Sequence, residues 1–141
     1  MADLNIAIVA SRFNPEITER LLAGAQAALQ GVAKVTVIHV PGAFEIPIAA
    51  RQAALSGRFD GIVTIGCVIR GETAHFEYIS NAATLGISQV GLETGIPVTF
   101  GVLTADTGEQ ALARSAPGPD YKGFHAPQAA AEMVHVLRGL K

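Results

Sequence analysis

The sequence predicts an α/β protein in which a four-stranded parallel sheet is covered by helices on both faces. Short runs rich in β-branched residues alternate four times with longer stretches of helical periodicity. Parallel neighbours need a crossover connection, and the stretches between these runs are long enough to supply a helix each time. The 141 residues contain no repeat, linker or low-complexity segment, so we expect a single domain spanning residues 1–141.

The first half of the chain supplies three strands and two helices. Strands are expected at 4–10, 34–40 and 61–68. Asn14 reads as an N-cap and Pro15 as the first residue of a helix that ends near residue 30. One buried stripe is expected on this helix, formed by Ile17, Leu21, Ala25 and Leu29. Pro47 is expected to open the second helix and Gly57 to close it.

The second half adds one strand and three helices. A helix is expected over 74–92 and the fourth strand over 97–104. Thr107 and Gln110 have the spacing of a capping box, which starts a helix reaching about residue 115. Residues 117–119, Pro-Gly-Pro, predict a rigid loop. Pro127 is expected to start the last helix, with one shared face formed by Ala130, Met133 and Leu137.

Composition narrows the class of protein. Half of the residues are hydrophobic and only 16% are charged, which is apolar for so small a domain, so we expect burial between subunits of a homo-oligomer. The net charge of −2 and the absence of a basic run exclude a nucleic-acid partner. The apolar runs are too short to span a bilayer, no signal peptide is visible, and the single cysteine excludes an internal disulfide. We therefore expect a cytoplasmic protein.

Ligands of parallel α/β sheets bind beyond the carboxyl ends of the strands. That rule selects residues 11–14, 41–45, 68–75 and the turn after Phe100. Phe13 could stack on a heteroaromatic ring or act as a hydrophobic staple on its own helix. Gly42 and Ala43 leave the backbone open to a ligand. Glu45 could accept bonds from hydroxyl groups, or could simply complement a helix N-terminus.

The third segment, GCVIRGETAHF (66–76), suggests an anion site. Gly71 permits a tight turn, and Glu72 and Thr73 precede a helix whose first N–H groups are free to bind phosphate. His75 lies in the first helical turn, where the dipole favours the neutral imidazole that acid–base catalysis needs. The alternative is that Thr73 only caps the helix and His75 is a solvated surface residue. Cys67 is expected to pack as a small buried hydrophobe.

The fourth segment adds candidate cations. Gly101 could let a ligand approach the backbone. Arg114, near a helix end, could hold a phosphate through its guanidinium fork, and Lys122 could meet a carbonyl or an anionic ring. Either cation could instead be an ordinary solvated side chain. The remaining histidines look structural, and no spacing of His, Cys or Asp is typical of a metal site.

Taken in chain order, these segments resemble the lumazine synthase family. The matching stretches are Arg12-Phe13-Asn14, VPGAFEIP (40–47), GCVIRGETAHFEYI (66–79), PVTFGVLT (97–104), EQALAR (109–114) and Lys122-Gly123. The resemblance implies a flavodoxin-like three-layer sandwich and a transferase-type condensing enzyme of riboflavin biosynthesis. It would join 5-amino-6-(D-ribitylamino)uracil to 3,4-dihydroxy-2-butanone 4-phosphate, with loss of phosphate and water, without a cofactor or metal.

The resemblance also implies roles for individual residues. His75 would be the catalytic proton shuttle, Glu72 and Thr73 would seat the phosphate through backbone N–H groups, and Arg114 would be its charged partner. The substrate-binding residues that it implies are Phe13, Asn14, Gly42, Ala43, Phe44, Glu45, Cys67, Val68, Ile69, Glu72, Thr73, Phe100, Arg114 and Lys122. The family forms pentamers with active sites between subunits, so Phe100, Arg114 and Lys122 would serve the neighbour's pocket.

One region departs from the family pattern, and two other functions remain open. Where the family commonly has Glu-Arg-Ala and later Asn-Lys-Gly, this chain has Ala113-Arg114-Ser115 and Tyr121-Lys122-Gly123. The fit of the loop between them is therefore a question for the structure. The alternatives are a non-catalytic flavin- or lumazine-binding paralogue and an archaeal-type riboflavin synthase.

Overall fold

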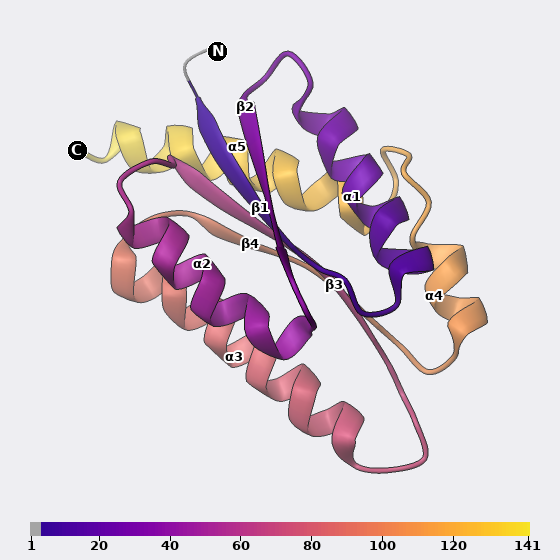
Figure 1. Ribbon diagram of the computed structural model, residues 1–141. Helices are drawn as coiled ribbons and strands as arrows, with labels where there is room; N and C mark the ends of the chain where they lie inside the picture. Colours follow the sequence, from indigo (N-terminus) through magenta and orange to yellow (C-terminus); the bar gives the residue numbers. More distant parts are fainter. Residues whose placement is uncertain (1–3) are drawn as a thin grey trace.

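The computed structural model describes residues 4–141 and confirms the four-stranded parallel sheet (Figure 1). Its strands are β1 (Asn5–Ser11), β2 (Lys34–Val40), β3 (Gly61–Ile69) and β4 (Val98–Ala105). They lie in the order β2-β1-β3-β4, and all three pairings are parallel. Because the strands run the same way, their carboxyl ends meet at one edge of the sheet.

Helices cover both faces of the sheet, as predicted, and each face has its own apolar core. α1 (Pro15–Leu29) and α5 (Lys122–Gly139) cover one face, with the short α4 (Gly108–Arg114) beyond its carboxyl end (Figure 1). α2 (Ile46–Leu55) and α3 (His75–Thr94) cover the other face. The predicted stripe of α1 is confirmed, because Ile17, Leu21, Ala25 and Leu29 are all at most 5% exposed. Among residues 4–141, no helix is long and apolar enough to cross a membrane.

The prediction for the last helix is wrong in its start, and of the face that it named only Ala130 is fully buried. α5 begins at Lys122, because the N–H groups of Phe124 and His125 already bond to the Tyr121 carbonyl. Pro127 therefore lies inside the helix. Met133 is 39% exposed, and the buried positions are Gly123, Ala126, Pro127, Ala130 and Val134. Because Pro127 has no N–H, it cannot make the helical bond to the Gly123 carbonyl in the second turn of α5.

Phe100 does not lie at the carboxyl edge, so the fourth segment was placed wrongly. Phe100 pairs with Thr64 in the middle of β3, and β4 continues to Ala105. Gly101 is buried, and a Cβ added there would collide with the Thr64 carbonyl oxygen. Glycine at position 101 is thus required for packing against β3 and not for the approach of a ligand.

Candidate functional site

The loops that follow β1 and β2 are joined to each other at the carboxyl edge. Arg12 N–H donates to the Val40 carbonyl at 2.8 Å, and Phe13 N–H donates to the Pro41 carbonyl at 3.0 Å. The Phe13 side chain is 70% exposed. It is therefore not packed as a hydrophobic staple, and its ring is free to contact a ligand.

Asn14 occupies the predicted N-cap position of α1 but has a different role. Its backbone is left-handed, with φ 61°, and its side chain makes no capping bond. Asparagine tolerates this conformation better than most residues. Its Nδ2 instead donates to the carbonyl of Cys67 at 3.2 Å. Asn14 thereby ties the loop after β1 to the end of β3.

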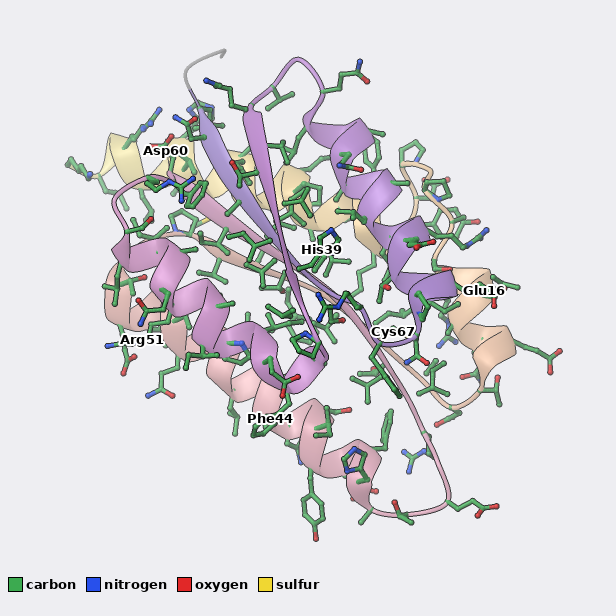
Figure 2. The ribbon with its side chains drawn as sticks, in the orientation of Figure 1. Glu16, His39, Phe44, Arg51, Asp60 and Cys67 are labelled. Carbon is green, nitrogen blue, oxygen red and sulfur yellow. The ribbon has the colours of Figure 1, made fainter. Side chains whose placement is uncertain are left out.

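The segment after β2 forms a short 3-10 turn, η1 (Ala43–Glu45), between the sheet and α2. Glu45 N–H donates to the Gly42 carbonyl at 3.1 Å, which closes the turn. Ala43 is buried, whereas the Phe44 ring is 58% exposed at the end of α2 (Figure 2). α3 packs against η1, so the predicted segments after β2 and β3 are neighbours.

The loop after β3 exposes the predicted phosphate seat and proton shuttle. Glu72, Thr73 and His75 are all exposed, and α3 begins at His75. Thr73 Oγ1 accepts a bond from the His75 N–H at 3.3 Å, but the N-cap position of α3 is Ala74 and no side chain caps the helix there. This local bond involves the threonine hydroxyl and leaves the imidazole of His75 open to solvent.

Arg70 braces this loop, a role that the sequence reasoning missed. Its Nε donates to Asp106 Oδ1 at 2.9 Å, Nη1 lies 3.5 Å from Glu77 Oε1, and its guanidinium lies 4.7 Å from the centre of the Phe76 ring. The hydrogen bond to Asp106, with smaller contributions from Glu77, raises the pKa of Arg70. The signal was available, because Arg70 is part of the Val-Ile-Arg-Gly stretch.

Cys67 is a core residue whose thiol is unsuited to catalysis. Its side chain is 2% exposed, and burial raises the pKa of the Cys67 thiol to about 11. A thiol becomes a nucleophile only as thiolate, which this environment disfavours. The neighbours Val68 and Ile69 reach the edge, with Val68 buried and Ile69 partly exposed.

Phe100 and Lys122 form a separate group at the outer edge of β4. Lys122 Nζ lies 5.2 Å from the centre of the Phe100 ring, and the two residues help line a hollow of about 420 Å³. Ile69, at the end of β3, lies five residues further along the strand than Thr64, the partner of Phe100. At about 3.3 Å per residue, this group lies about 16 Å along the strands from the carboxyl end of β3.

Arg114 is the last residue of α4, beyond the carboxyl end of β4. It is exposed, and it takes part in none of the ion pairs formed within residues 4–141. The predicted capping of α4 is confirmed, since Thr107 Oγ1 accepts from the Gln110 N–H at 3.1 Å. A charged guanidinium without a partner carboxylate is available to an anion.

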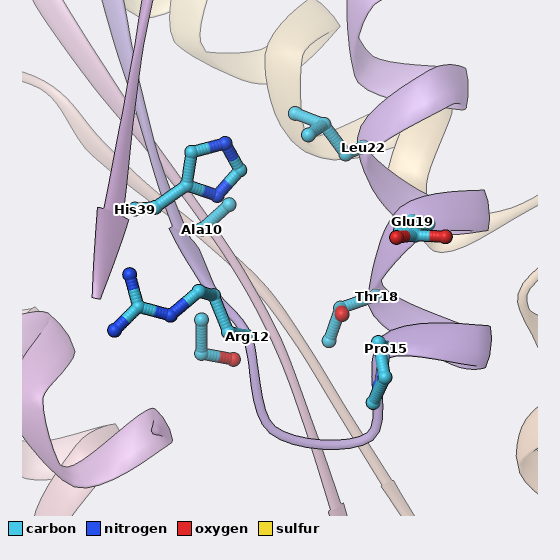
Figure 3. A pocket seen from close by; sticks show the side chains of 8 residues that line it. Ala10, Arg12, Pro15, Thr18, Glu19, Leu22 and His39 are labelled. Carbon is cyan, nitrogen blue, oxygen red and sulfur yellow. The ribbon is translucent and has the colours of Figure 1, made fainter. Parts of the chain in front are cut away.

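A different hollow, of about 310 Å³, lies between β2 and α1 (Figure 3). Arg12, Glu19 and His39 line it, together with Ala10, Ser11, Pro15, Thr18 and Leu22. None of the predicted site residues is among them. Elsewhere in residues 4–141, no group of three or more His, Cys, Asp or Glu is arranged to hold a metal ion.

The fold and the exposed carboxyl edge define the class of protein. The chain is a flavodoxin-like α/β protein with an exposed aromatic ring, a helix start and an unpaired arginine at or beyond the carboxyl edge of its sheet. Such an edge suits a ligand that combines a flat ring with an anionic group.

Comparison with known proteins identifies the family. A sequence model described as 6,7-dimethyl-8-ribityllumazine synthase matches residues 3–138. The chain is 51% identical over 140 residues to 6,7-dimethyl-8-ribityllumazine synthase 1 of Caulobacter vibrioides, covering 96% of this chain and 92% of the relative. The chain therefore belongs to the 6,7-dimethyl-8-ribityllumazine synthase family, and the family predicted from the sequence is confirmed.

Proposed function

We propose that the chain condenses 5-amino-6-(D-ribitylamino)uracil with 3,4-dihydroxy-2-butanone 4-phosphate to form 6,7-dimethyl-8-ribityllumazine, releasing phosphate and water in riboflavin biosynthesis. The family match over nearly the whole chain carries this proposal. The exposed edge supports it, because the two substrates together present a flat pyrimidine ring and a phosphate.

The phosphate end of the butanone would bind at the start of α3. The exposed stretch from Glu72 to His75 leads into the first turn of α3, where N–H groups lack helical partners. Arg114 would supply the positive charge. His75, exposed in the first helical turn, would accept and return protons as the imine forms and phosphate leaves.

The pyrimidine and its ribityl chain would bind beside the loops after β1 and β2. Phe13 offers an exposed ring for stacking, and Phe44 a second apolar surface. Gly42, Ala43 and Glu45 would contact the ribityl chain. Val68 and Ile69 would border the ring, while Cys67 would contribute only through the carbonyl that orients Asn14.

Two chains would build one site. Phe100 and Lys122 lie about 16 Å back along the strands from the end of β3, and His75 follows that end by six residues, so we do not expect one small molecule to touch all three within one chain. A neighbouring copy that presents its β4 edge to this carboxyl edge would bring both groups together. Arg114, Phe100 and Lys122 would then belong to the neighbour's half of the site.

An apolar stripe on α3 supports self-association. Tyr78, Leu85 and Leu92 follow one another at intervals of seven residues and are 72%, 71% and 84% exposed. Residues seven apart lie on one helix face, so the stripe needs a covering partner. We propose that residues 1–141 act as one domain of a cytoplasmic homopentamer or a larger assembly of pentamers.

The direct test mixes the purified protein with both substrates and follows the absorbance of the lumazine. Product above the uncatalysed background supports the enzyme. Absence of product with retained lumazine or flavin binding would point to the non-catalytic paralogue. Conversion of lumazine itself to riboflavin would point to the riboflavin synthase.

Variants of two residues test the assigned roles. His75→Ala should lower kcat by about 10²–10⁴-fold with little change in KM. Arg114→Ala should raise the KM for the butanone phosphate by about 10-fold or more, because it removes a charge-assisted bond. An unchanged KM would show that Arg114 does not hold the phosphate.

A further inference from the structure

The connection between α4 and α5 is held down on α1 at several points. A Cβ added at Gly24 of α1 would lie only 3.1 Å from the Pro117 Cα. A Cβ added at Gly123 would lie 2.6 Å from the Leu21 carbonyl oxygen. Both glycines therefore allow the chain to lie directly against α1. Arg114 and Lys122 stand at the two ends of this connection.

Arg20 adds a polar contact at the Arg114 end. Its Nε donates to Ser115 Oγ at 3.0 Å, and its Nη2 lies 3.3 Å from the Leu112 carbonyl oxygen. Ser115 is 0% exposed, and its hydroxyl donates onward to Leu112 O at 3.1 Å. Ser115 Oγ thus has a donor and an acceptor partner, both fixed in place.

These bonds satisfy a carbonyl group in the last turn of α4, a helix too short to be stable by itself. α4 has seven residues, well below the length at which an isolated helix is stable in water. The last carbonyls of a helix have no partner within it. The Leu112 carbonyl is satisfied here by Ser115 and Arg20, and Arg114 lies between Leu112 and Ser115 in the chain. The bonds from Arg20 of α1 therefore hold the backbone that carries Arg114.

We propose that Arg20 is a positioning residue which acts through Ser115 to hold Arg114 at the phosphate position. This inference rests on the proposed function, in which Arg114 binds the butanone phosphate. Arg20 contacts the chain on both sides of Arg114, so its loss would release the guanidinium of Arg114 without removing it. Misplacing a binding group by about 1 Å can cost up to about 100-fold in rate.

Steady-state kinetics of Arg20→Ala and Ser115→Ala test the inference. We expect the KM for the butanone phosphate to rise about 5- to 50-fold in Arg20→Ala and by a smaller factor in Ser115→Ala. The KM for ribitylaminouracil should change less than about twofold. The matched control is Arg51→Ala, because Arg51 is an exposed arginine on α2, on the opposite face of the sheet (Figure 2); it should leave both KM values unchanged.

A double-mutant cycle separates positioning from general stabilisation. If Arg20 acts through Arg114, then adding Arg20→Ala to Arg114→Ala should raise the butanone phosphate KM no further. Independent, multiplying effects would overturn the inference. So would wild-type KM values in both Arg20→Ala and Ser115→Ala while Arg114→Ala is impaired.

Two further outcomes are distinguishable from failure of the inference itself. If the wild-type protein forms no lumazine, the proposed function fails, which is a different result from any failure of the variants. If thermal unfolding or light scattering shows that Arg20→Ala does not fold or assemble, the butanone phosphate KM of Ser115→Ala becomes the test of the inference. That variant removes one buried hydroxyl, and an unchanged butanone phosphate KM in it would overturn the inference.

Discussion

Coexpression of two impaired variants would show whether a site is built by two chains. One chain carries His75→Ala and the other Lys122→Ala, with different affinity tags so that mixed assemblies can be purified. His75 follows the end of β3 by six residues, and Lys122 lies beside Phe100, about 16 Å back along the strands from that end. The proposed shared site therefore takes His75 from one chain and Lys122 from its neighbour.

The expected recovery follows from counting interfaces. Each variant alone should be strongly impaired, by about 10²-fold or more for His75→Ala and about 10-fold or more for Lys122→Ala. In a random one-to-one mixture, an intact site needs His75 from one chain and Lys122 from its neighbour. Each choice has a chance of one half, so about one quarter of the sites should be restored, whatever the number of chains in the ring.

The assay is lumazine formation per chain, compared with the mean of the two variants purified separately. Mixed assemblies should reach about one quarter of wild-type activity. Activity no higher than the mean of the separate variants would refute the shared site. As a control, a chain carrying both substitutions is coexpressed with wild type. Shared sites predict about one quarter of wild-type activity here too, whereas sites within one chain predict about one half.

Three further predictions concern residues whose surroundings the structure defines. Gly71→Ala should leave thermal stability unchanged or slightly raised, because a Cβ there meets nothing within 4 Å and the backbone is not left-handed; a loss of activity without loss of stability would then report close approach of the phosphate to residue 71. Thr107→Ala should cost about 0.5–2 kcal/mol in urea unfolding, because it removes the bond from the Gln110 N–H, and Thr107→Ser should recover most of it. The third prediction compares wild type with Cys67→Ala across pH: burial raises the pKa of the folded thiol from 9.0 to about 11, so the stability linked to it is complete below pH 9 and falls as pH rises from 9 towards 11. The free energy of unfolding of wild type should fall more steeply over this interval than that of Cys67→Ala, and parallel curves would contradict the assignment.

Much of the fold could be predicted because it depends on local patterns. The apolar spacing of α1 predicted its buried stripe, and Thr107 predicted the start of α4. Pro127 misled the prediction because proline is favoured at helix starts, whereas the helix had already been started by the carbonyl of Tyr121. The sequence pattern shows positions that favour proline, but it does not show whether hydrogen bonds before the proline have already started the helix.

The structure places several of the candidate site residues differently from what the sequence predicted. Asn14 was expected to cap α1, and instead its amide bonds to Cys67, 53 residues away in the chain. Gly101 was expected to admit a ligand, and instead it admits the carbonyl of Thr64. In both cases the deciding partner lies on a neighbouring strand, and the register of that strand cannot be read from a local motif.

By itself, the sequence determined the order of the strands and helices, the parallel sheet and the motifs that identify the family. The elements and the sheet follow from periodicity and from turn residues. The family motifs are short segments that can be read directly from the chain. Only the tertiary structure decided which of those motifs are neighbours in the folded chain. A hydrogen bond joins the loops that contain Phe13 and Pro41. Phe100 lies in the middle of the sheet, away from the loop that leads to His75. Arg20 bonds to Ser115 at the end of α4. Those relations depend on strand register and on helix packing, because both are set by contacts between residues far apart in the chain.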